Sequence, residues 1–145
     1  MNLTENFTLE EFAHSETATR RGLLNEPSPE IVETLKHTAA RMEEIRELLG
    51  VPITILSGYR SVKVNSAVGG NPQSQHVLGE ACDFIAPGFG APQEVCRAIL
   101  DSTIAFDQLI EEGTWTHISF SAEPRRSVLT AHFENGKTRY TAGIA

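Results

Sequence analysis

Residues 74–83 read SQHVLGEACD, and this segment passes from a polar turn into a short apolar strand. The glycine at position 79 lets the backbone change direction, so we expect His76 on a loop and Asp83 on the strand that follows. Neighbouring side chains on a strand point to opposite faces, so Cys82 and Asp83 would rarely bind the same ion. The segment therefore offers one imidazole and one carboxylate, seven residues apart, as candidate metal ligands.

A third candidate ligand is His117, which ends the tripeptide WTH on another expected strand. Two imidazoles and one carboxylate are a common ligand set for a zinc ion that keeps a fourth position open for water. Neutral imidazole combined with carboxylate also suits a borderline-soft metal. Three more histidines are present, and we expect them to be exposed or capping residues: His14, His37 and His132.

The composition is that of an ordinary globular domain and argues against several classes of protein. Twelve basic and nineteen acidic side chains give a net charge of −7, which disfavours nucleic acid as the main partner because a phosphate backbone attracts a basic surface. The longest apolar runs are far too short to span a bilayer, so no membrane insertion is expected. Residues 1–14 lack a cationic segment followed by an apolar one, so no signal peptide is expected. Cys82 and Cys96 are predicted to be reduced and buried.

Three helices are predicted from capping residues and apolar spacing. Thr8, with Glu11 three residues later, has the spacing of a capping box at the start of a short helix. The strongest helix is capped by Ser28, has proline at its first position and ends at Gly50. Pro92–Leu100 fits a third helix. The apolar stripe of the strongest helix predicts a core-packing face made of Ile31, Leu35, Thr38, Met42, Ile45, Leu48 and Leu49.

Strands dominate the second half of the chain. They are predicted at residues 51–56, 81–85, 106–112, 115–121, 128–133 and 137–140. Residues 61–73 are expected to be loop, or a short helix followed by loop. Gly113-Thr114 favours a hairpin between the third and fourth strands, and Asn135-Gly136 favours a type I′ turn between the last two. Because helices come mainly first and strands later, the sequence predicts a single α+β domain over residues 1–145, with helices packed on an antiparallel β-sheet.

Three motifs around the candidate ligands form a recognisable set. SGYRS at residues 57–61, SQHVLGEACD at 74–83 and WTH at 115–117 together resemble the zinc D-alanyl-D-alanine carboxypeptidase family, which includes peptidoglycan endopeptidases. The resemblance implies a Hedgehog/DD-peptidase-like fold and a Zn²⁺ cofactor. It also implies three metal ligands: His76, Asp83 and His117.

The likeness continues upstream and points to the branch of this family often found in phages and prophages. It rests on FTLEEF at residues 7–12, Asn25, RELLG at 46–50 and the glycine pair at 69–70. The resemblance therefore covers about residues 7–120.

The resemblance implies roles for three residues near the metal. Arg60 matches the family arginine that faces the substrate, where a guanidinium can bind a peptide carboxylate or stabilise a developing oxyanion. The alternative is a surface or structural ion pair. Ser74 is expected either to donate a hydrogen bond to the substrate or the ligands, or to act as a turn or cap residue. Trp115 is expected to pack beside the metal and shape the substrate cleft.

The general base is assigned from the alternation of side chains on strands. Many members of the wider group carry an acidic residue three positions before the last histidine, but here this position is Thr114, which cannot accept a proton at neutral pH. If the turn lies at this position, Glu112 pairs with Trp115 and shares a face with His117, whereas Glu111 lies on the other face. The acidic residue of the phage-type branch also falls at position 112. We therefore predict Glu112 as base or proton shuttle, with a solvated hairpin-end carboxylate as the alternative.

These expectations describe a monomeric zinc metallopeptidase that hydrolyses amide bonds of peptidoglycan stem peptides, as a carboxypeptidase or an endopeptidase. Without a signal peptide, the protein would stay in the bacterial cytoplasm until a holin released it to the cell wall as an endolysin, or it would travel in a virion. The alternative is a zinc-stabilised cell-wall-binding or virion structural module without catalytic activity. The missing acidic residue at position 114 favours that alternative.

Overall fold

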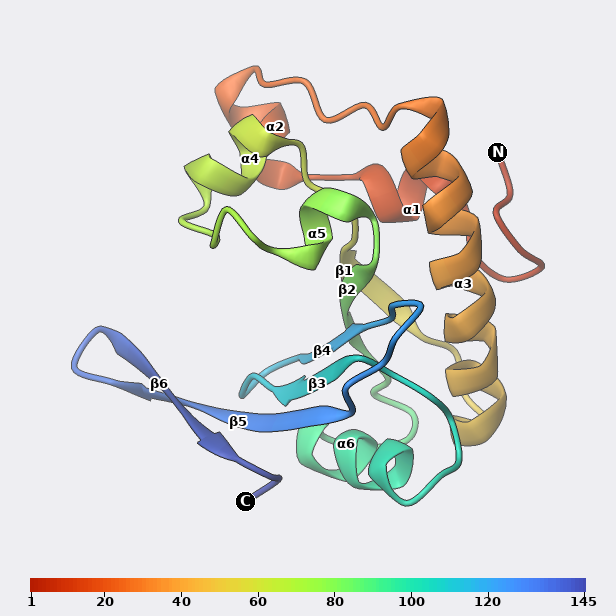
Figure 1. Cartoon of the computed structure of the whole chain (residues 1–145), viewed down its shortest axis with the longest axis vertical. Coiled ribbons are helices and arrows are strands. Elements are labelled where there is room, and N and C mark those ends of the chain that lie inside the picture. Colours follow the sequence, from red (N-terminus) through yellow and green to blue (C-terminus); the bar gives the residue numbers. More distant parts are fainter. The chain divides into compact units, whose positions relative to one another are not determined.

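The computed structural model describes the whole chain, Met1–Ala145, with six helices and six strands (Figure 1). The helices are α1 (Leu9–Ala13), α2 (Glu16–Arg21), α3 (Pro29–Leu49), α4 (Val62–Ala67), α5 (Gln75–Leu78) and α6 (Pro92–Leu100). The strands are β1 (Thr54–Ser57), β2 (Ala81–Ile85), β3 (Gln108–Glu111), β4 (Thr116–Ser119), β5 (Ser127–Glu134) and β6 (Lys137–Ala142). None of the helices combines the length and the apolar character needed to cross a bilayer.

The chain divides into two compact units. The first unit comprises Met1–Glu43 and Ile55–Cys82, and the second comprises Glu44–Thr54 and Asp83–Ala145. Strand β2 crosses the division, because its first two residues belong to the first unit and the other three to the second. The prediction of a single domain over the whole chain stays a prediction.

The first unit begins with the predicted capping box. The side chain of Thr8 accepts a hydrogen bond from the Glu11 N–H, and the Glu11 carboxylate accepts one from the Thr8 N–H. In α1, Phe12 is fully buried and its ring lies 5.9 Å from that of Phe7 in an edge-on arrangement. Helix α2, which was not predicted, is capped by Ser15 and lies beside α4 (Figure 1). Its six residues include no apolar stripe from which a helix could be recognised.

Helix α3 has the predicted boundaries. The Ser28 hydroxyl accepts a hydrogen bond from the Ile31 N–H at 3.3 Å, and Gly50 follows the last turn with φ 69°. Most of the predicted stripe is buried: Leu35, Thr38, Met42, Ile45 and Leu49. The stripe differs at two positions, because Ile31 is half-buried and Leu48 is exposed.

The strands form one six-stranded sheet in the order β1-β2-β4-β3-β5-β6. Two of its hairpins are as predicted: β3 pairs with β4 and β5 pairs with β6, both antiparallel. The second of these turns has φ 50° at Asn135 and φ 73° at Gly136, as a type I′ turn requires. Strand β3, however, pairs with β5 in parallel. The prediction of an antiparallel sheet was therefore wrong, since the sheet of this α+β chain is mixed.

The parallel pair arises because β4 reverses the chain before β5 begins. Strand β4 ends at Ser119 and β5 starts at Ser127, and both residues pair with Gln108 at the start of β3. The connecting loop only has to pass this end of β3, so the long crossover that usually joins parallel strands is not needed. The Asp107 carboxylate holds the loop there by accepting hydrogen bonds of 2.7–3.0 Å from the backbone and guanidinium of Arg125.

Helix α6 covers one face of β3 and β4 in the second unit. This face carries Leu109 and Ile118, both fully buried, and Thr116, whose hydroxyl accepts a hydrogen bond of 3.8 Å from the Cys96 thiol of α6. Cys96 and Cys82 are both buried and free, as predicted. On β3 and β4, the side chains that alternate with Leu109, Thr116 and Ile118 point to the opposite face of the sheet, which carries the polar residues described below.

Candidate metal centre

His76 lies on α5, a single helical turn, and not on the expected loop. The Ser74 hydroxyl caps this turn by accepting a hydrogen bond from the His76 N–H at 3.2 Å, and Gly79 ends it with φ 77°. A Cβ atom at position 79 would lie 3.2 Å from the Ile31 side chain, and the Gly79 carbonyl accepts a hydrogen bond of 2.7 Å from Thr38. Glycine here lets α5 pack directly on α3. Four residues are too few to show helical spacing in the sequence.

The His76 ring is oriented by a glycine carbonyl. The imidazole is 2% exposed, and its Nδ1 lies 2.6 Å from the Gly58 oxygen. Because a carbonyl oxygen can only accept, Nδ1 carries the proton and Nε2 carries the lone pair. Metal-binding histidines commonly donate their second ring nitrogen in this way. At position 58 a Cβ atom would lie 2.6 Å from the Phe12 oxygen, so this close approach requires glycine.

The second unit contributes a carboxylate and an imidazole from two strands. Asp83 Oδ1 of β2 lies 2.9 Å from Nδ1 of His117 on β4. The His117 residue is 9% exposed and the Asp83 side chain 15% exposed, so both groups are largely withdrawn from water. Their mutual hydrogen bond fixes the two side chains relative to each other.

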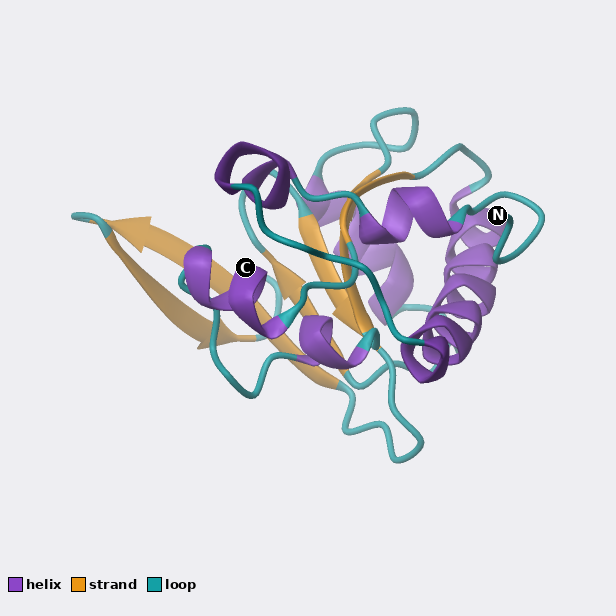
Figure 2. Ribbon diagram, turned by 90° about the horizontal axis from the view of Figure 1, so that it is seen from above, coloured by secondary structure: helices purple, strands orange, loops and turns teal.

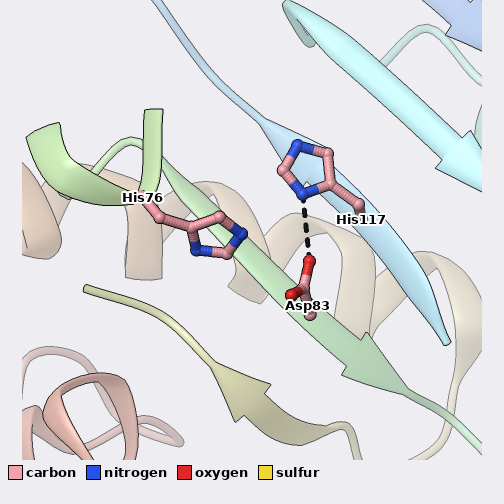
Figure 3. A group of neighbouring side chains, drawn as sticks. All are labelled: His76, Asp83 and His117. Carbon is pink, nitrogen blue, oxygen red and sulfur yellow. Dashed lines mark hydrogen bonds and ion pairs between the residues drawn. The ribbon is translucent and has the colours of Figure 1, made fainter. Parts of the chain in front are cut away.

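One ligand atom from each of His76, Asp83 and His117 lies within 4.8 Å of the others. Figure 3 shows the three side chains pointing toward one another from α5, β2 and β4. Such a group could hold one metal ion, and two imidazole nitrogens with one carboxylate oxygen leave a tetrahedral ion one position for water or substrate. The donor types and the Gly58 hydrogen bond to His76 both fit zinc. The cluster does not include Cys82.

The backbone of Arg60 is hydrogen-bonded to that of His76. Its N–H donates a hydrogen bond of 3.1 Å to the His76 carbonyl, and its side chain is half-buried. The Asn25 amide holds this loop, because it donates to the Tyr59 carbonyl at 3.1 Å and accepts from the Ser61 N–H at 2.7 Å. This positioning role of Asn25 was not predicted, since its partners lie 34 and 36 residues away in the sequence.

The β3–β4 hairpin has the predicted register. Glu111 pairs with Thr116, and the Glu112 N–H donates a hydrogen bond of 3.0 Å to the Trp115 carbonyl. By alternation, Glu112 and Trp115 share the face of His117, and Glu111 lies on the other face. Glu112 and Trp115 are both half-buried, and the Trp115 indole N–H is buried without a hydrogen-bond acceptor.

Thr114 lies at the exposed hairpin turn, on the side of α6. It lines a cavity of about 230 Å³ together with Val95 of α6 and Thr116. Thr116 lies on the face opposite His117. Thr114, at the position that lacks an acidic residue, therefore borders the α6 side of the hairpin. Glu112 belongs to the opposite face, which carries His117 and Trp115 and is called the metal face below.

Three protein ligands with one open coordination position are typical of metal-dependent enzymes. The Peptidase M15 family model matches residues 5–119, and the chain belongs to this family. Over 63 aligned residues it is 40% identical to the zinc D-Ala-D-Ala carboxypeptidase of Streptomyces albus G. The alignment covers 41% of this chain and 25% of the relative, so the chain spans about a quarter of that protein's length. The family resemblance seen in the sequence is thereby confirmed.

Proposed function

We propose that the protein is a zinc-dependent peptidase that hydrolyses amide bonds in peptidoglycan stem peptides, as a D-Ala-D-Ala carboxypeptidase or an endopeptidase. The observation that carries this proposal is the cluster of His76, Asp83 and His117, whose ligand atoms lie within 4.8 Å of one another. Membership of the Peptidase M15 family supports the reaction class, and the zinc D-Ala-D-Ala carboxypeptidase relative supports the metal and the substrate.

His76, Asp83 and His117 would hold the zinc ion. The Gly58 carbonyl keeps the proton of His76 on Nδ1, which leaves Nε2 for the metal. His117 Nδ1 and Asp83 Oδ1 lie 2.9 Å apart, and a metal bound by both atoms would displace the proton that they share. When bound, zinc would supply Lewis-acid chemistry, which polarises a carbonyl and makes water easier to deprotonate.

Glu112 is the proposed general base. Its position on the His117 face, one residue from the hairpin turn, supports this role, in which Glu112 would take a proton from the attacking water and return it to the leaving amine. Arg60 is proposed to bind a substrate carboxylate or the developing oxyanion through its guanidinium. These two residues would complete the catalytic group.

Ser74 and Trp115 are proposed to contact the substrate. The Ser74 hydroxyl acts as an acceptor in capping α5, so its O–H can still donate to a peptide oxygen. Trp115, whose backbone is hydrogen-bonded to that of Glu112 across the hairpin, would shape the substrate cleft.

We also propose the Hedgehog/DD-peptidase fold, a single domain, a monomeric state and a role as a phage or prophage lysin delivered by a holin or in a virion. The upstream sequence likeness to the phage-type branch supports this role.

Digestion of purified peptidoglycan, followed by mass spectrometry of the muropeptides, tests the function. Zinc-loaded protein should release terminal D-alanine if it is a carboxypeptidase, or shorten the stem internally if it is an endopeptidase. The Asp83→Ala variant should give neither product. Stoichiometric zinc in the wild-type protein, combined with an unchanged muropeptide profile, would refute the enzymatic function.

The second candidate is a zinc-stabilised cell-wall-binding or virion structural module without turnover, favoured by the threonine at position 114. Such a module would sediment with insoluble peptidoglycan, or be incorporated into particles, and would release no product.

A further inference from the structure

Strand β6 carries a tyrosine, Tyr140, in a part of the chain that the family model does not match. The match ends at residue 119, and β5 and β6 follow it. These two strands form the long ribbon that ends in a tight turn in Figure 2. Tyr140 is 50% exposed, so part of its side chain is open to solvent.

The strand registers place Tyr140 on the metal face of the sheet. Glu111 of β3 pairs with Thr130 of β5, so the next position along brings Glu112 beside Ala131. Ala131 in turn pairs with Tyr140 of β6. Paired residues on neighbouring strands point to the same face. Glu112, Ala131 and Tyr140 therefore stand in one row across three strands, and the Glu112–Trp115 hydrogen bond extends this row to the fourth.

The residue in the middle of this row has a small side chain. Ala131 has only a methyl group, and adjacent strands lie roughly 4.8 Å apart, so the strand of Tyr140 is roughly 10 Å from that of Glu112. A tyrosine side chain can lean over the methyl and cover most of this distance. Burial and the negative charges of Glu112 and Asp83 raise the pKa of Tyr140, so its hydroxyl stays protonated at neutral pH and can donate a hydrogen bond.

A second aromatic residue of the hairpin lies close to the turn between β3 and β4. Phe133, two residues after Ala131 on the same face, lies against the turn between β3 and β4, where a Cβ atom at Gly113 would be 3.1 Å from its ring. With φ 83°, this turn position favours glycine in any case. The edge of the Phe133 ring therefore lies beside the turn next to Glu112, although Phe133 is 57% exposed.

We propose that Tyr140 is a substrate-contact residue, which donates a hydrogen bond from its hydroxyl to an oxygen of the stem peptide and lays its ring along the peptide. This inference rests on the proposed function and extends it, because it assigns part of the substrate cleft to the β5–β6 hairpin. A phenol O–H can donate to a carbonyl oxygen that lies over Glu112, whereas an ionised carboxylate can only accept.

The test compares three variants. Tyr140→Phe removes only the hydroxyl, and Tyr140→Ala removes the ring. Arg139→Ala is the matched control, because Arg139 is the neighbour of Tyr140 on the opposite face and its ion pair with Glu134 is exposed. Trp115 is the single tryptophan of the chain and stands in the row of Tyr140, so its fluorescence can report binding of a synthetic stem pentapeptide ending in D-Ala-D-Ala. Titrations in a Glu112→Gln background prevent consumption of the peptide.

We expect Tyr140→Phe to raise the Kd about 3- to 10-fold and Tyr140→Ala by more than about 10-fold, the range that follows from one lost hydrogen bond plus ring contact. Arg139→Ala should stay within about twofold. In the active background the same factors should appear in KM, with kcat nearly unchanged, because the contact is made equally in the bound substrate and the transition state.

A Kd within twofold of the parent for both Tyr140 variants would overturn the role of Tyr140. An increase for Tyr140→Ala alone, accompanied by a lower unfolding temperature, would show a structural role and overturn it as well. If the wild-type protein binds the peptide but never cleaves any stem peptide, the proposed function fails while the titration still decides the role of Tyr140. If the wild-type protein neither binds nor cleaves the peptide, both are refuted.

Discussion

The two faces of the β3–β4 hairpin are built from alternating residues of the same short strands, yet their chemistry differs. The face under α6 carries Leu109, Thr116 and Ile118, each at most 1% exposed. The metal face carries the His117 imidazole and, at the hairpin end, the Glu112 carboxylate. A shift of the pairing by one residue would exchange the two faces completely. The turn that sets the register therefore decides on which face the His117 imidazole and the Glu112 carboxylate lie.

The largest effect is expected from the aspartate of the metal face. The Asp83→Asn variant loses a charged ligand. Loss of an outer hydrogen-bond partner of a ligand weakens metal binding roughly 10- to 100-fold, so the loss of the Asp83 charge should weaken zinc binding further than that. Peptidase activity should fall to background. Zinc content after dialysis against a weak chelator, measured by mass spectrometry, checks this.

Asp107→Asn is the matched control, because Asp107 is a buried, hydrogen-bonded aspartate on the other face. It is 4% exposed and accepts from Arg125 at 2.7 Å. This variant should lose about 1–3 kcal/mol of stability and keep its zinc. Loss of zinc from Asp107→Asn, or full zinc in Asp83→Asn, would contradict the division between the faces.

The next largest effect is expected from the two neighbouring glutamates at the end of β3. Glu112→Gln should lower kcat by about 10²- to 10⁴-fold, the contribution of a positioned general base, and leave zinc bound. Glu111→Gln, on the opposite face, should keep its activity within about twofold. Its carboxylate accepts a hydrogen bond of 2.6 Å from the Gly113 N–H, so the expected cost is about 0.5–1.5 kcal/mol of stability. Equal losses of kcat in the two variants would show that the register does not select the base.

Local patterns in the sequence predicted much of this arrangement. The capping box at Thr8, the bounds of α6 and the pairing of Glu112 with Trp115 each depend on residues a few positions apart. The ligand set followed from the family resemblance, which carries information on distant residues that spacing does not.

The features that the sequence did not predict are non-local. The Gly58 carbonyl that accepts from His76 lies 18 positions away in the sequence. The turn residues of a hairpin predict the pairing of consecutive strands such as β3 and β4, but not the parallel pairing of β3 with β5. Tyr140 carries no motif of its own. Its place on the metal face follows only from the pairing of β3 with β5 combined with the pairing of β5 with β6.

A smaller effect on activity, but a clear one on stability, is expected on the α6 face. Ile118 is fully buried, so Ile118→Ala should lower the free energy of unfolding by about 2–5 kcal/mol, and Ile118→Val by about 0.5–1.5 kcal/mol. The protein that remains folded should bind zinc normally, because Ile118 points away from His117. Chemical unfolding combined with zinc analysis checks this, and a variant that is stable but lacks zinc would contradict it.

The smallest effect is expected at alkaline pH and belongs to Cys96 on the same buried face. Burial raises the pKa of this thiol from 9.0 to about 12, so the folded protein holds the proton more tightly than the unfolded chain. The resulting stabilisation is fully present below pH 9 and is lost as the pH rises toward 12. The unfolding temperature of wild-type protein should therefore fall more steeply above pH 9 than that of Cys96→Ala. In native protein at pH 8, a thiol reagent should react with Cys96 only as fast as the structure opens. Immediate labelling, or identical pH profiles for the two proteins, would show that the α6 face is not sealed, and the contrast with the metal face would then be lost.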